Sequence, residues 1–326
     1  MQASVLIPTR NRRESLLRTL RALRAQRNSG PPFEVIVCFD RCTDGSLDAV
    51  AAEFPRVRTT RVSGPGPSAA LNAAARLATA SLLIFLDDDM EPVPDFVAAH
   101  VAAHCAAAGS IAVAGRIIPV VVTRSLFSDS IEAFYRDFAR QLESGELESS
   151  PHGLPGGNAS IAADAFHAVG GVDERYEFMK WDFELAARLL ERGFRLVYEH
   201  DAAATTYLQL DTAEMLWRAS RRAASDVRLA RDHPWSVSYL ELYGAATRDD
   251  LRGTVLWHAA PALRTAATLM RPIAPMWPTI ARVEMVARYW SELRRQLGDR
   301  DALRALVANQ GLPPAAPAAA PAPTLR

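Results

Sequence analysis

The chain has 326 residues, of which 49% are hydrophobic and 23% are charged. This length is enough to bury a full α/β core and to carry an additional segment. The 37 basic and 37 acidic side chains cancel to a formal net charge of zero, so the chain lacks the overall positive field with which proteins bind phosphate backbones. We therefore expect no nucleic-acid partner.

Cysteine usage and the N-terminal segment indicate the compartment. The three cysteines are an odd number and form no zinc-like C-x-x-C pair, so neither a disulfide framework nor a structural metal site is expected. The first residues lack a basic leader with a long apolar run, and no stretch of about 18 uncharged apolar residues follows. We expect a cytoplasmic protein, with peripheral attachment to the inner membrane face as an alternative.

The N-terminal part alternates short apolar runs with segments of helical spacing. The runs expected to form buried strands are Ala3–Ile7, Phe33–Phe39, Val57–Val62 and Leu82–Leu86. Leucines recur at helical spacing from Leu16 to Leu23, and an alanine-rich helix is expected over Ala69–Ala80. Strands separated by helices in this way predict βαβ units, and hence an α/β fold with a mostly parallel sheet flanked by helices.

This alternation continues to about residue 210. The later expected elements are helices over Phe96–Ala107 and Asp182–Arg192 and strands at Ile111–Val113, Ile117–Val122 and Leu196–Tyr198. Beyond about Asp211, helical spacing with many arginines takes over. The predicted parts are an α/β domain over 1–210, a helical C-terminal extension over 211–311 and a disordered Pro/Ala-rich tail over 312–326.

The segment Leu251–Trp290 is apolar but interrupted by charge. It is rich in Leu, Met, Trp and Pro and carries five arginines. Helices packed on the α/β domain are the favoured interpretation. The same composition is typical of helices that lie on a membrane surface, so peripheral membrane contact through 251–290 is the alternative.

Three successive carboxylates, Asp87, Asp88 and Asp89, follow the apolar run Leu82–Leu86. In open α/β sheets, ligands bind at the carboxyl ends of the strands, where this triplet is expected to lie. Adjacent carboxylates near a core repel one another unless a cation neutralises them, and hard oxygen ligands suit Mg²⁺ or Mn²⁺. The triplet therefore predicts a metal site, with a solvated capping turn before the helix near Asp95 as the alternative.

Five segments extend this pattern along the chain. They are Ser4–Asn11, Asp40 with Thr43–Ser46, Phe85–Asp89, Gly156–Asn158 and Trp181–Leu185. In this order and spacing they resemble the motifs of family 2 glycosyltransferases, and the resemblance covers roughly residues 3–210. It implies the Rossmann-like GT-A fold. It also implies inverting transfer of a sugar from a nucleoside-diphosphate-sugar donor to an acceptor hydroxyl, assisted by Mn²⁺ or Mg²⁺.

The resemblance implies roles for residues that would contact the nucleoside. Pro8, Thr9 and Asn11 match the first nucleotide-contacting loop, and Asp40 matches the carboxylate that hydrogen-bonds the base or the ribose. Ordinary loop capping is the alternative for Thr9 and Asn11, and a turn-forming aspartate is the alternative for Asp40.

The triplet matches the D-x-D motif of the same family. Asp87 then lies near the ribose, and Asp89, with Asp87, is on the metal that bridges the diphosphate. Asp88 fills the variable middle position and is included among the expected substrate-binding residues.

On the acceptor side, Gly156, Gly157 and Asn158 match a segment whose glycines let the backbone approach the donor sugar, with a flexible surface loop as the alternative. Asp182 matches the aspartate of the family's Glu-Asp motif, which implies a general base for the acceptor hydroxyl. A plain helix N-cap is the alternative for Asp182.

Two positions depart from the family pattern. Trp181 stands where a glutamate is usual, and its ring is expected either to stack on a sugar or to serve as a core or lid aromatic. Leu71 stands where many relatives carry an arginine that meets the phosphates, so diphosphate contact is expected from elsewhere in this chain.

Two other functional classes are kept as alternatives. A catalytically silent binding or scaffold protein of the same fold would use the helical extension as its interaction surface. A sugar nucleotidyltransferase would need a glycine-rich basic loop after the first strand, which residues 8–12 do not form. The donor base and sugar, the oligomeric state and the acceptor, whether glycan, lipid carrier, peptide or small metabolite, are not predicted.

Overall fold

The computed structural model describes residues 3–27, 30–64, 66–122, 126–208, 212–247, 251–270 and 277–314. These residues form two compact units. The first contains the residues up to Val122 together with Ser130–Leu208, and the second contains Thr123–Asp129 and Gln209–Pro313, as far as they are described. Most of the tail predicted over 312–326 lies outside the described residues.

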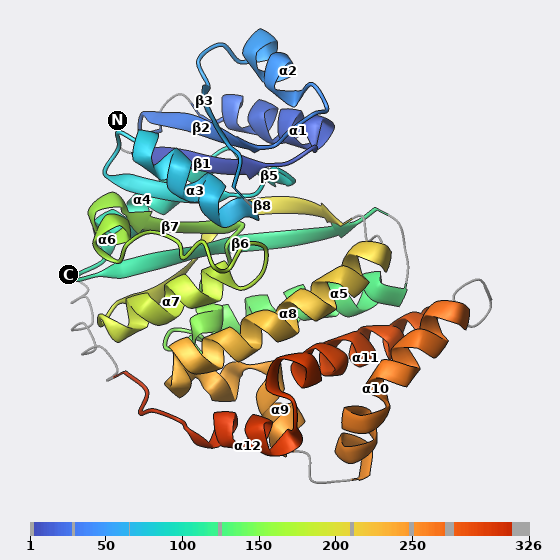
Figure 1. Ribbon diagram of the computed structural model, residues 1–326. Helices are drawn as coiled ribbons and strands as arrows, with labels where there is room; N and C mark the ends of the chain where they lie inside the picture. The colour runs from blue at the N-terminus through green and yellow to red at the C-terminus, as the bar shows by residue number, and fades with distance from the viewer. Residues whose placement is uncertain are drawn as a thin grey trace. The chain divides into compact units, whose positions relative to one another are not determined.

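A mixed sheet forms the centre of the first unit (Figure 1). Its strands in the described chain are β1 (Ala3–Thr9), β2 (Phe33–Asp40), β3 (Arg58–Val62), β4 (Leu82–Leu86), β5 (Met90–Pro92), β6 (Ile111–Val121), β7 (Asn158–Ala162) and β8 (Arg195–Leu208). Their spatial order is β3-β2-β1-β4-β7-β6-β8-β5. Strands β1 to β4 are parallel where they pair, as are β6 and β8, whereas β7 runs antiparallel to both of its neighbours.

Burial explains why these sequences form strands at these places. Every residue of β4 is buried, and so is every residue of β1 except Pro8, which fits strands covered by helices on both faces. Strand β3 lies at the edge of the sheet and reads Arg-Thr-Thr-Arg-Val, with none of its residues fully buried. Strand β6 runs as one strand through the gap between the two runs expected from the sequence, and the register with β8 shifts between Gly115 and Ile117, where the extra residues belong to β8.

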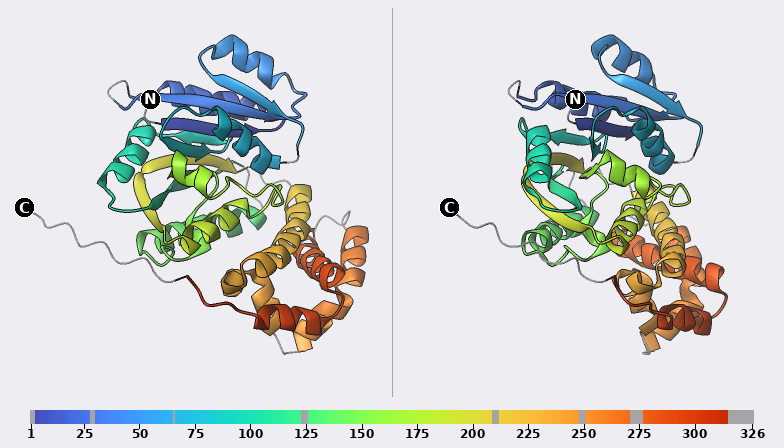
Figure 2. Two further views of the ribbon diagram at one scale, coloured as in Figure 1. Left: turned by 60° about the vertical axis from the view of Figure 1, so that its left-hand side comes forward. Right: turned by 90° about the vertical axis from the view of Figure 1, so that its left-hand side faces the viewer.

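Helices connect and cover the strands of the first unit (Figures 1 and 2). They are α1 (Arg13–Arg24), α2 (Ser46–Glu53), α3 (Gly66–Leu77), α4 (Phe96–Ala106), α5 (Leu126–Glu143), α6 (Ala163–Ala168) and α7 (Trp181–Glu191). The leucine face of α1 packs with Val37 and Phe39 of β2 and with Val50 of α2 in one hydrophobic core. This core includes residues of β1, β2 and β4, so it holds these strands rigidly and fixes where their loops begin.

The strand pairing decides which loops meet. In the parallel strands, Thr9 of β1 lies beside Phe39 of β2, so the loops after both strands emerge at the same edge. Strand β7 runs the other way, and its first residue, Asn158, pairs with Leu86, the last residue of β4. The segment before β7 therefore meets the segment after β4, and the Asp87 N–H donates to the Gly157 carbonyl at 3.1 Å.

The second unit is helical in the described residues. Its helices are α8 (Thr212–Asp232), α9 (Glu241–Thr247), α10 (Leu251–Met270), α11 (Trp277–Leu297) and α12 (Arg300–Ala308). Helix α11 packs against α8 and α10, and the Tyr289 hydroxyl donates to the buried Asp226 carboxylate at 2.5 Å. Residues 271–276 of the segment 251–290 lie outside the described residues, and membrane contact through this segment stays a prediction.

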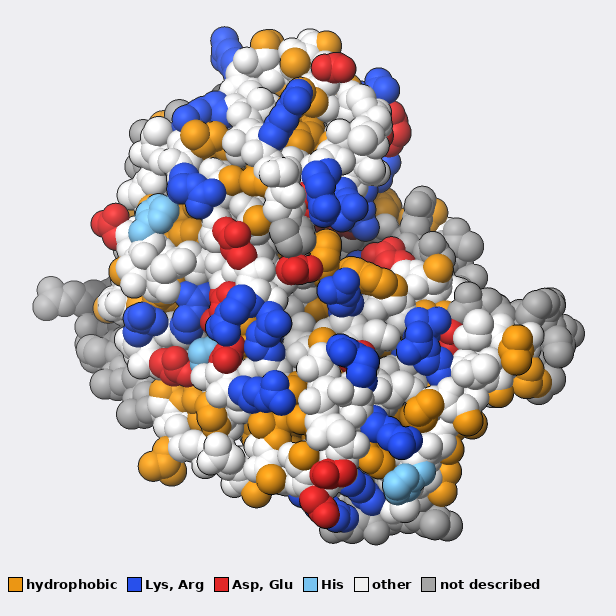
Figure 3. Space-filling view, viewed as in Figure 1, with side chains coloured by type: hydrophobic (Ala, Val, Ile, Leu, Met, Phe, Trp, Pro, Cys, Tyr) orange, Lys and Arg blue, Asp and Glu red, His pale blue; other side chains and the backbone are white. Residues whose placement is uncertain are grey.

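Two surface properties bear on partners. In the part of the chain that the structure describes, no helix is both long enough and apolar enough to cross a bilayer. On the face shown in Figure 3, Lys and Arg side chains are spread among apolar and acidic ones and do not gather into a single field.

The buried carboxylate of Glu34 links strands β1, β2 and β3 near their amino ends. Glu34 of β2 accepts hydrogen bonds from the Ser4 hydroxyl, from Thr79 and from the Arg58 guanidinium, each at 2.7 Å. Burial alone would raise the pKa of Glu34, but the hydrogen bonds from Arg58, Thr79 and Ser4 outweigh it and lower the pKa to about 2. Because the folded pKa lies below the ordinary value, the ionised carboxylate stabilises the fold above about pH 4.5, and this contribution is lost as the pH falls toward 2.

We predict that Glu34→Gln lowers the free energy of unfolding at pH 7 by about 2 kcal/mol, because charge-assisted hydrogen bonds are lost in a buried site. Urea unfolding at several pH values should also show a flatter loss of stability in the variant between pH 4.5 and 2. Glu14→Gln, which removes an exposed carboxylate 3.8 Å from the Arg13 guanidinium, is the matched control and should leave the pH dependence unchanged. Equal pH slopes for Glu34→Gln and the wild type would contradict this account.

Candidate functional site

The acidic triplet lies at the carboxyl end of β4, and its three side chains have different surroundings. Asp88 is only 5% exposed and accepts a hydrogen bond from the Thr9 hydroxyl at 2.6 Å. Asp89 is partly exposed and accepts from Arg12 Nη1 at 2.6 Å, and the same nitrogen lies 3.3 Å from Asp88. Asp87 lies beside Gly157, on the side of β7. The triplet thus faces the loop after β1 on one side and the segment before β7 on the other.

The triplet carries more negative charge than its surroundings neutralise. Burial raises the pKa of Asp87 to about 7, and the charges of Asp89 and Asp88 act in the same direction. Burial also raises the pKa of Asp88 to about 6, against the opposing charge of Arg12. Both shifts show that a further positive charge here would be favourable, because it would stabilise the ionised forms.

The donor atoms of the triplet fit a hard divalent cation. Carboxylate oxygens suit Mg²⁺ or Mn²⁺, and these ions keep waters and substrate phosphates in their coordination shell. Within the described ranges, no three His, Cys, Asp or Glu side chains come together as a complete metal site. The carboxylates of the triplet that could hold such an ion are those of Asp89 and Asp87.

Asp40, at the end of β2, is buried and lies next to the start of α3. Its carboxylate accepts from the Gly66 N–H at 3.1 Å and from Arg41 Nε at 3.0 Å. The Arg10 guanidinium lies 3.9 Å away. These contacts hold the buried carboxylate between Arg10, in the loop after β1, and Gly66 at the start of α3.

Asn11 joins the loops that follow β1 and β2. It has a left-handed backbone with a φ of 52°, and its side-chain oxygen accepts from the Thr43 N–H at 2.7 Å. Asp44 reinforces this junction by accepting from the N–H groups of Arg13 and Ser46. Asn11 therefore shapes the loop that carries Thr9 and Arg12, in agreement with the capping alternative, and its side chain is already engaged.

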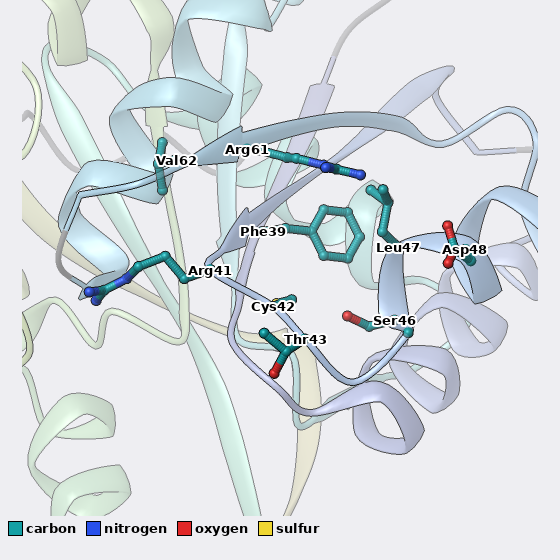
Figure 4. A pocket seen from close by; sticks show the side chains of 10 residues that line it. Phe39, Arg41, Cys42, Thr43, Ser46, Leu47, Asp48, Arg61 and Val62 are labelled. Atoms are coloured by element: carbon teal, nitrogen blue, oxygen red, sulfur yellow. The ribbon is translucent and has the colours of Figure 1, made fainter.

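A pocket of about 410 Å³ lies near Asp40 but on the other face of the sheet. Phe39 and Leu47 line it, with the Arg61 side chain reaching across Phe39 and with Thr43 and Ser46 on the opposite side (Figure 4). Successive side chains of a strand point to opposite faces, and Phe39 packs with the α1 and α2 core whereas Asp40 bonds to Gly66 of α3. Phe39 therefore faces the pocket, whereas the Asp40 side chain faces α3; Arg41, which bonds to Asp40, also lines the pocket.

Two glycines allow the segment before β7 to come close to the triplet and to α7. A Cβ on Gly157 would overlap the Asp87 carboxylate and lie 2.6 Å from Met90 Cε, and a Cβ on Gly156 would overlap the Trp181 ring. Asp182 accepts from the Gly156 N–H at 3.0 Å, and its other oxygen accepts from the Phe183 N–H at 2.9 Å. Asp182 is partly exposed, and its charge contributes to the raised pKa of Asp87.

Two residues expected to contact the substrate are occupied inside the protein. Asn158 is fully buried, with its amide nitrogen bonded to the carbonyls of Arg116 and Ala202 and its oxygen bonded to the ring of His100. Trp181 is 7% exposed and packs edge-on against Phe85 at a ring distance of 6.1 Å. The geometry therefore favours the core alternative for Trp181. Both side chains are engaged in contacts within the protein.

The structure adds contacts that the motifs did not indicate. Arg12 pairs with Asp89 and Arg41 with Asp40. Each arginine directly follows a residue of the motifs, and this position could have indicated its role from the sequence. Asn72 bonds to both backbone groups of Val172 and to Glu174, so it fastens the turn after α6 to α3. Leu71, one residue earlier, is 1% exposed and belongs to the core.

Comparison with known proteins identifies the first unit. The model of glycosyl transferase family 2 matches residues 4–170. Validoxylamine A glucosyltransferase of Streptomyces hygroscopicus subsp. limoneus is 28% identical over 285 residues, covering 76% of this chain and 62% of the relative. Pre-mycofactocin glycosyltransferase of Mycobacterium tuberculosis is 28% identical over 251 residues, covering 74% of this chain and 50% of the relative. The chain thus spans about half to three fifths of the length of these relatives.

Solved structures show the same fold. The mannosyltransferase PcManGT of Pyrobaculum calidifontis, in complex with GDP-Man and Mn²⁺, has a TM-score of 0.58 at 20% identity, covering 90% of this chain and 88% of that one. S. aureus TarS 1–349 in complex with UDP has a TM-score of 0.51 at 17% identity, covering 92% of each chain. The prediction of a GT-A-like α/β fold with a helical C-terminal region is confirmed. The sheet, predicted to be mostly parallel, is mixed, because β7 runs antiparallel to β4 and β6 and β5 runs antiparallel to β8.

We predict that Gly157→Ala displaces the Asp87 carboxylate and lowers the free energy of unfolding, because the added methyl group has no space beside Asp87 and Met90. The expected loss is about 1–3 kcal/mol in the free energy of unfolding, measured in urea. Gly244→Ala is the control, since a Cβ at Gly244 of α9 would meet no atom within 4 Å. If Gly157→Ala were as stable as Gly244→Ala, the close contact of residue 157 with Asp87 would not limit the size of its side chain.

Proposed function

The chain belongs to glycosyl transferase family 2, and from this premise we propose that it transfers a sugar from a nucleoside-diphosphate-sugar to an acceptor hydroxyl with inversion. The observation that carries the proposal is the convergence of two sets of groups on the end of β4. Thr9 and Arg12 meet Asp88 and Asp89 on one side, and Gly157 meets Asp87 on the other. Donor and acceptor would bind on these two sides.

The donor half of the proposed site uses the loops after β1 and β2. Thr9 and Asp88 form a buried hydrogen-bonded pair in this half of the site. Asp40, at the end of β2, would accept a hydrogen bond from the base or the ribose. Pro8 and Asn11 give this loop its shape. PcManGT was solved with GDP-Man and TarS with UDP, which supports a nucleoside-diphosphate donor and leaves the base open.

The diphosphate would lie over the triplet. A divalent cation held by Asp89 and Asp87 would stabilise the charge that develops on the departing nucleoside diphosphate. The raised pKa values of Asp87 and Asp88 support this assignment, because both carboxyl groups need a positive charge to ionise fully near neutral pH. The PcManGT complex contains Mn²⁺, which agrees with Mn²⁺ or Mg²⁺ here.

On the acceptor side, we assign Asp182 as the general base. Two backbone N–H groups hold its carboxylate in one orientation at the start of α7, and Gly156 and Gly157 lie between it and Asp87. Asp182 would take the proton of the acceptor hydroxyl while the oxygen bonds to the anomeric carbon and the bond from that carbon to the diphosphate breaks. A single displacement of this kind inverts the anomeric configuration.

We predict that Asp89→Asn lowers metal-dependent release of nucleoside diphosphate from donor sugars about a hundredfold or more, because the metal ion that would stabilise the leaving group would lose an anionic ligand. A coupled assay over UDP- and GDP-sugars with Mn²⁺ measures this. The control is Asp95→Asn, which removes a surface carboxylate paired with Arg27 at 3.0 Å. Unchanged turnover in Asp89→Asn would contradict the assignment, and an inactive wild type with intact partner binding would favour the scaffold alternative.

We predict that Asp182→Asn lowers kcat by about 10²–10⁴-fold, the usual range for loss of a general base, with little change in the dissociation constant of the nucleoside diphosphate. Asp164→Asn, at an exposed position in the first turn of α6, is the control for loss of one negative charge. A parallel loss of nucleotide affinity and kcat in Asp182→Asn would instead assign Asp182 to positioning of the Gly156–Gly157 segment.

A further inference from the structure

We propose that Arg12 is an internal counter-cation of the acidic triplet. In the protein without donor, its guanidinium takes the place of a cation at Asp89, and when metal and donor bind, it leaves this position and pairs with the diphosphate. This inference rests on the proposed function for its second step only, since the first step concerns the triplet and a metal ion alone.

The contacts of Arg12 give the first step. Its Nη1 atom lies 2.6 Å from Asp89 Oδ2 and 3.3 Å from Asp88 Oδ1, so one nitrogen bridges two carboxylates. Both contacts are ion pairs, with Asp88 on one side and Asp89 on the other. Arg12 therefore already supplies part of the positive charge that the triplet requires.

A metal ion and Arg12 compete for the same oxygen. Asp88 Oδ2 is engaged by the Thr9 hydroxyl, which leaves Asp89 as the accessible ligand on this side of the triplet. Asp89 Oδ2 is the atom that Arg12 holds most closely. A dication bound there would also repel the guanidinium, so the metal and Arg12 would not both bind Asp89.

The local structure lets the side chain move while the backbone stays fixed. Arg12 precedes α1 and its side chain is 41% exposed. On either side of it, Asn11 bonds to Thr43 and the Arg13 N–H bonds to Asp44. The long side chain can therefore swing on a rigid base without disturbing the fold.

A diphosphate next to the triplet is the nearest new partner for the displaced guanidinium. Its planar pair of N–H donors matches phosphate oxygens, and a charge-assisted hydrogen bond to phosphate would replace those lost at Asp88 and Asp89. Helix α3 does not supply this charge at position 71, where Leu71 is buried in the core. Arg12 would then pass from one anionic partner to the other without being left unpaired.

The test measures Mn²⁺ alone and nucleotide separately in Arg12→Gln. Without nucleotide, the free Mn²⁺ signal in electron paramagnetic resonance should show about tenfold tighter Mn²⁺ binding than in the wild type, because a competing charged hydrogen bond is removed. At saturating Mn²⁺, calorimetry should show about tenfold weaker binding of UDP or GDP, whichever the wild type binds. A role of Arg12 in folding alone would not move these two affinities in opposite directions.

Arg13→Gln is the matched control, since it removes the same charge one residue further on, where the side chain faces Glu14. It should leave both affinities near the wild-type values, and Arg12→Lys should bring Mn²⁺ affinity back toward that of the wild type. Unchanged Mn²⁺ affinity in Arg12→Gln overturns the counter-cation role even when nucleotide binding is normal. If the wild type binds neither UDP nor GDP while Arg12→Gln gains Mn²⁺ affinity, the counter-cation role stands and the proposed donor site fails.

Discussion

Strand β4 pairs with β1 on one edge and with β7 on the other, and the candidate site depends on these two pairings. The parallel pairing with β1 places the loop that carries Thr9 beside Asp88. The antiparallel pairing with β7 sets Leu86 opposite Asn158, which brings Gly157 against Asp87 and, through Gly156, Asp182 into the same region. Because β7 runs against its neighbours, its leading loop joins the loops that follow the parallel strands.

The second constraint is charge. Three carboxylates at the end of a buried strand cannot all ionise at low cost, and the raised pKa values of Asp87 and Asp88 record this conflict. Arg12 relieves part of it through Asp88 and Asp89. The same excess of negative charge would make a metal ion with a diphosphate a favourable ligand, so the repulsion among the carboxylates and the proposed affinity for the donor have one physical origin.

Much of this could be predicted from sequence because it is local. The alternation of strands and helices, the triplet after β4 and Asp182 at the start of α7 are all contiguous patterns. Strand β7 is not among the strands expected from the sequence, since the short segment Asn158–Ala162 contains two polar residues and has no strong strand pattern, and its antiparallel direction depends on contacts with distant strands. Side-chain partners could not be predicted either. The Gly156–Asn158 segment indicates that Asn158 contacts the substrate, whereas in the structure its side chain bonds to His100, Arg116 and Ala202.

The central claim is that the end of β4 holds a metal ion and a nucleoside diphosphate together. A crystal structure of the protein with Mn²⁺ and the nucleoside diphosphate that it binds tests this most directly, because anomalous scattering locates the metal independently of the nucleotide. The account predicts a manganese peak in coordination contact with Asp89 and a diphosphate oxygen, with the nucleoside next to Thr9 and Asp40. A manganese peak away from Asp87–Asp89, or a nucleotide bound elsewhere on the chain, would contradict it.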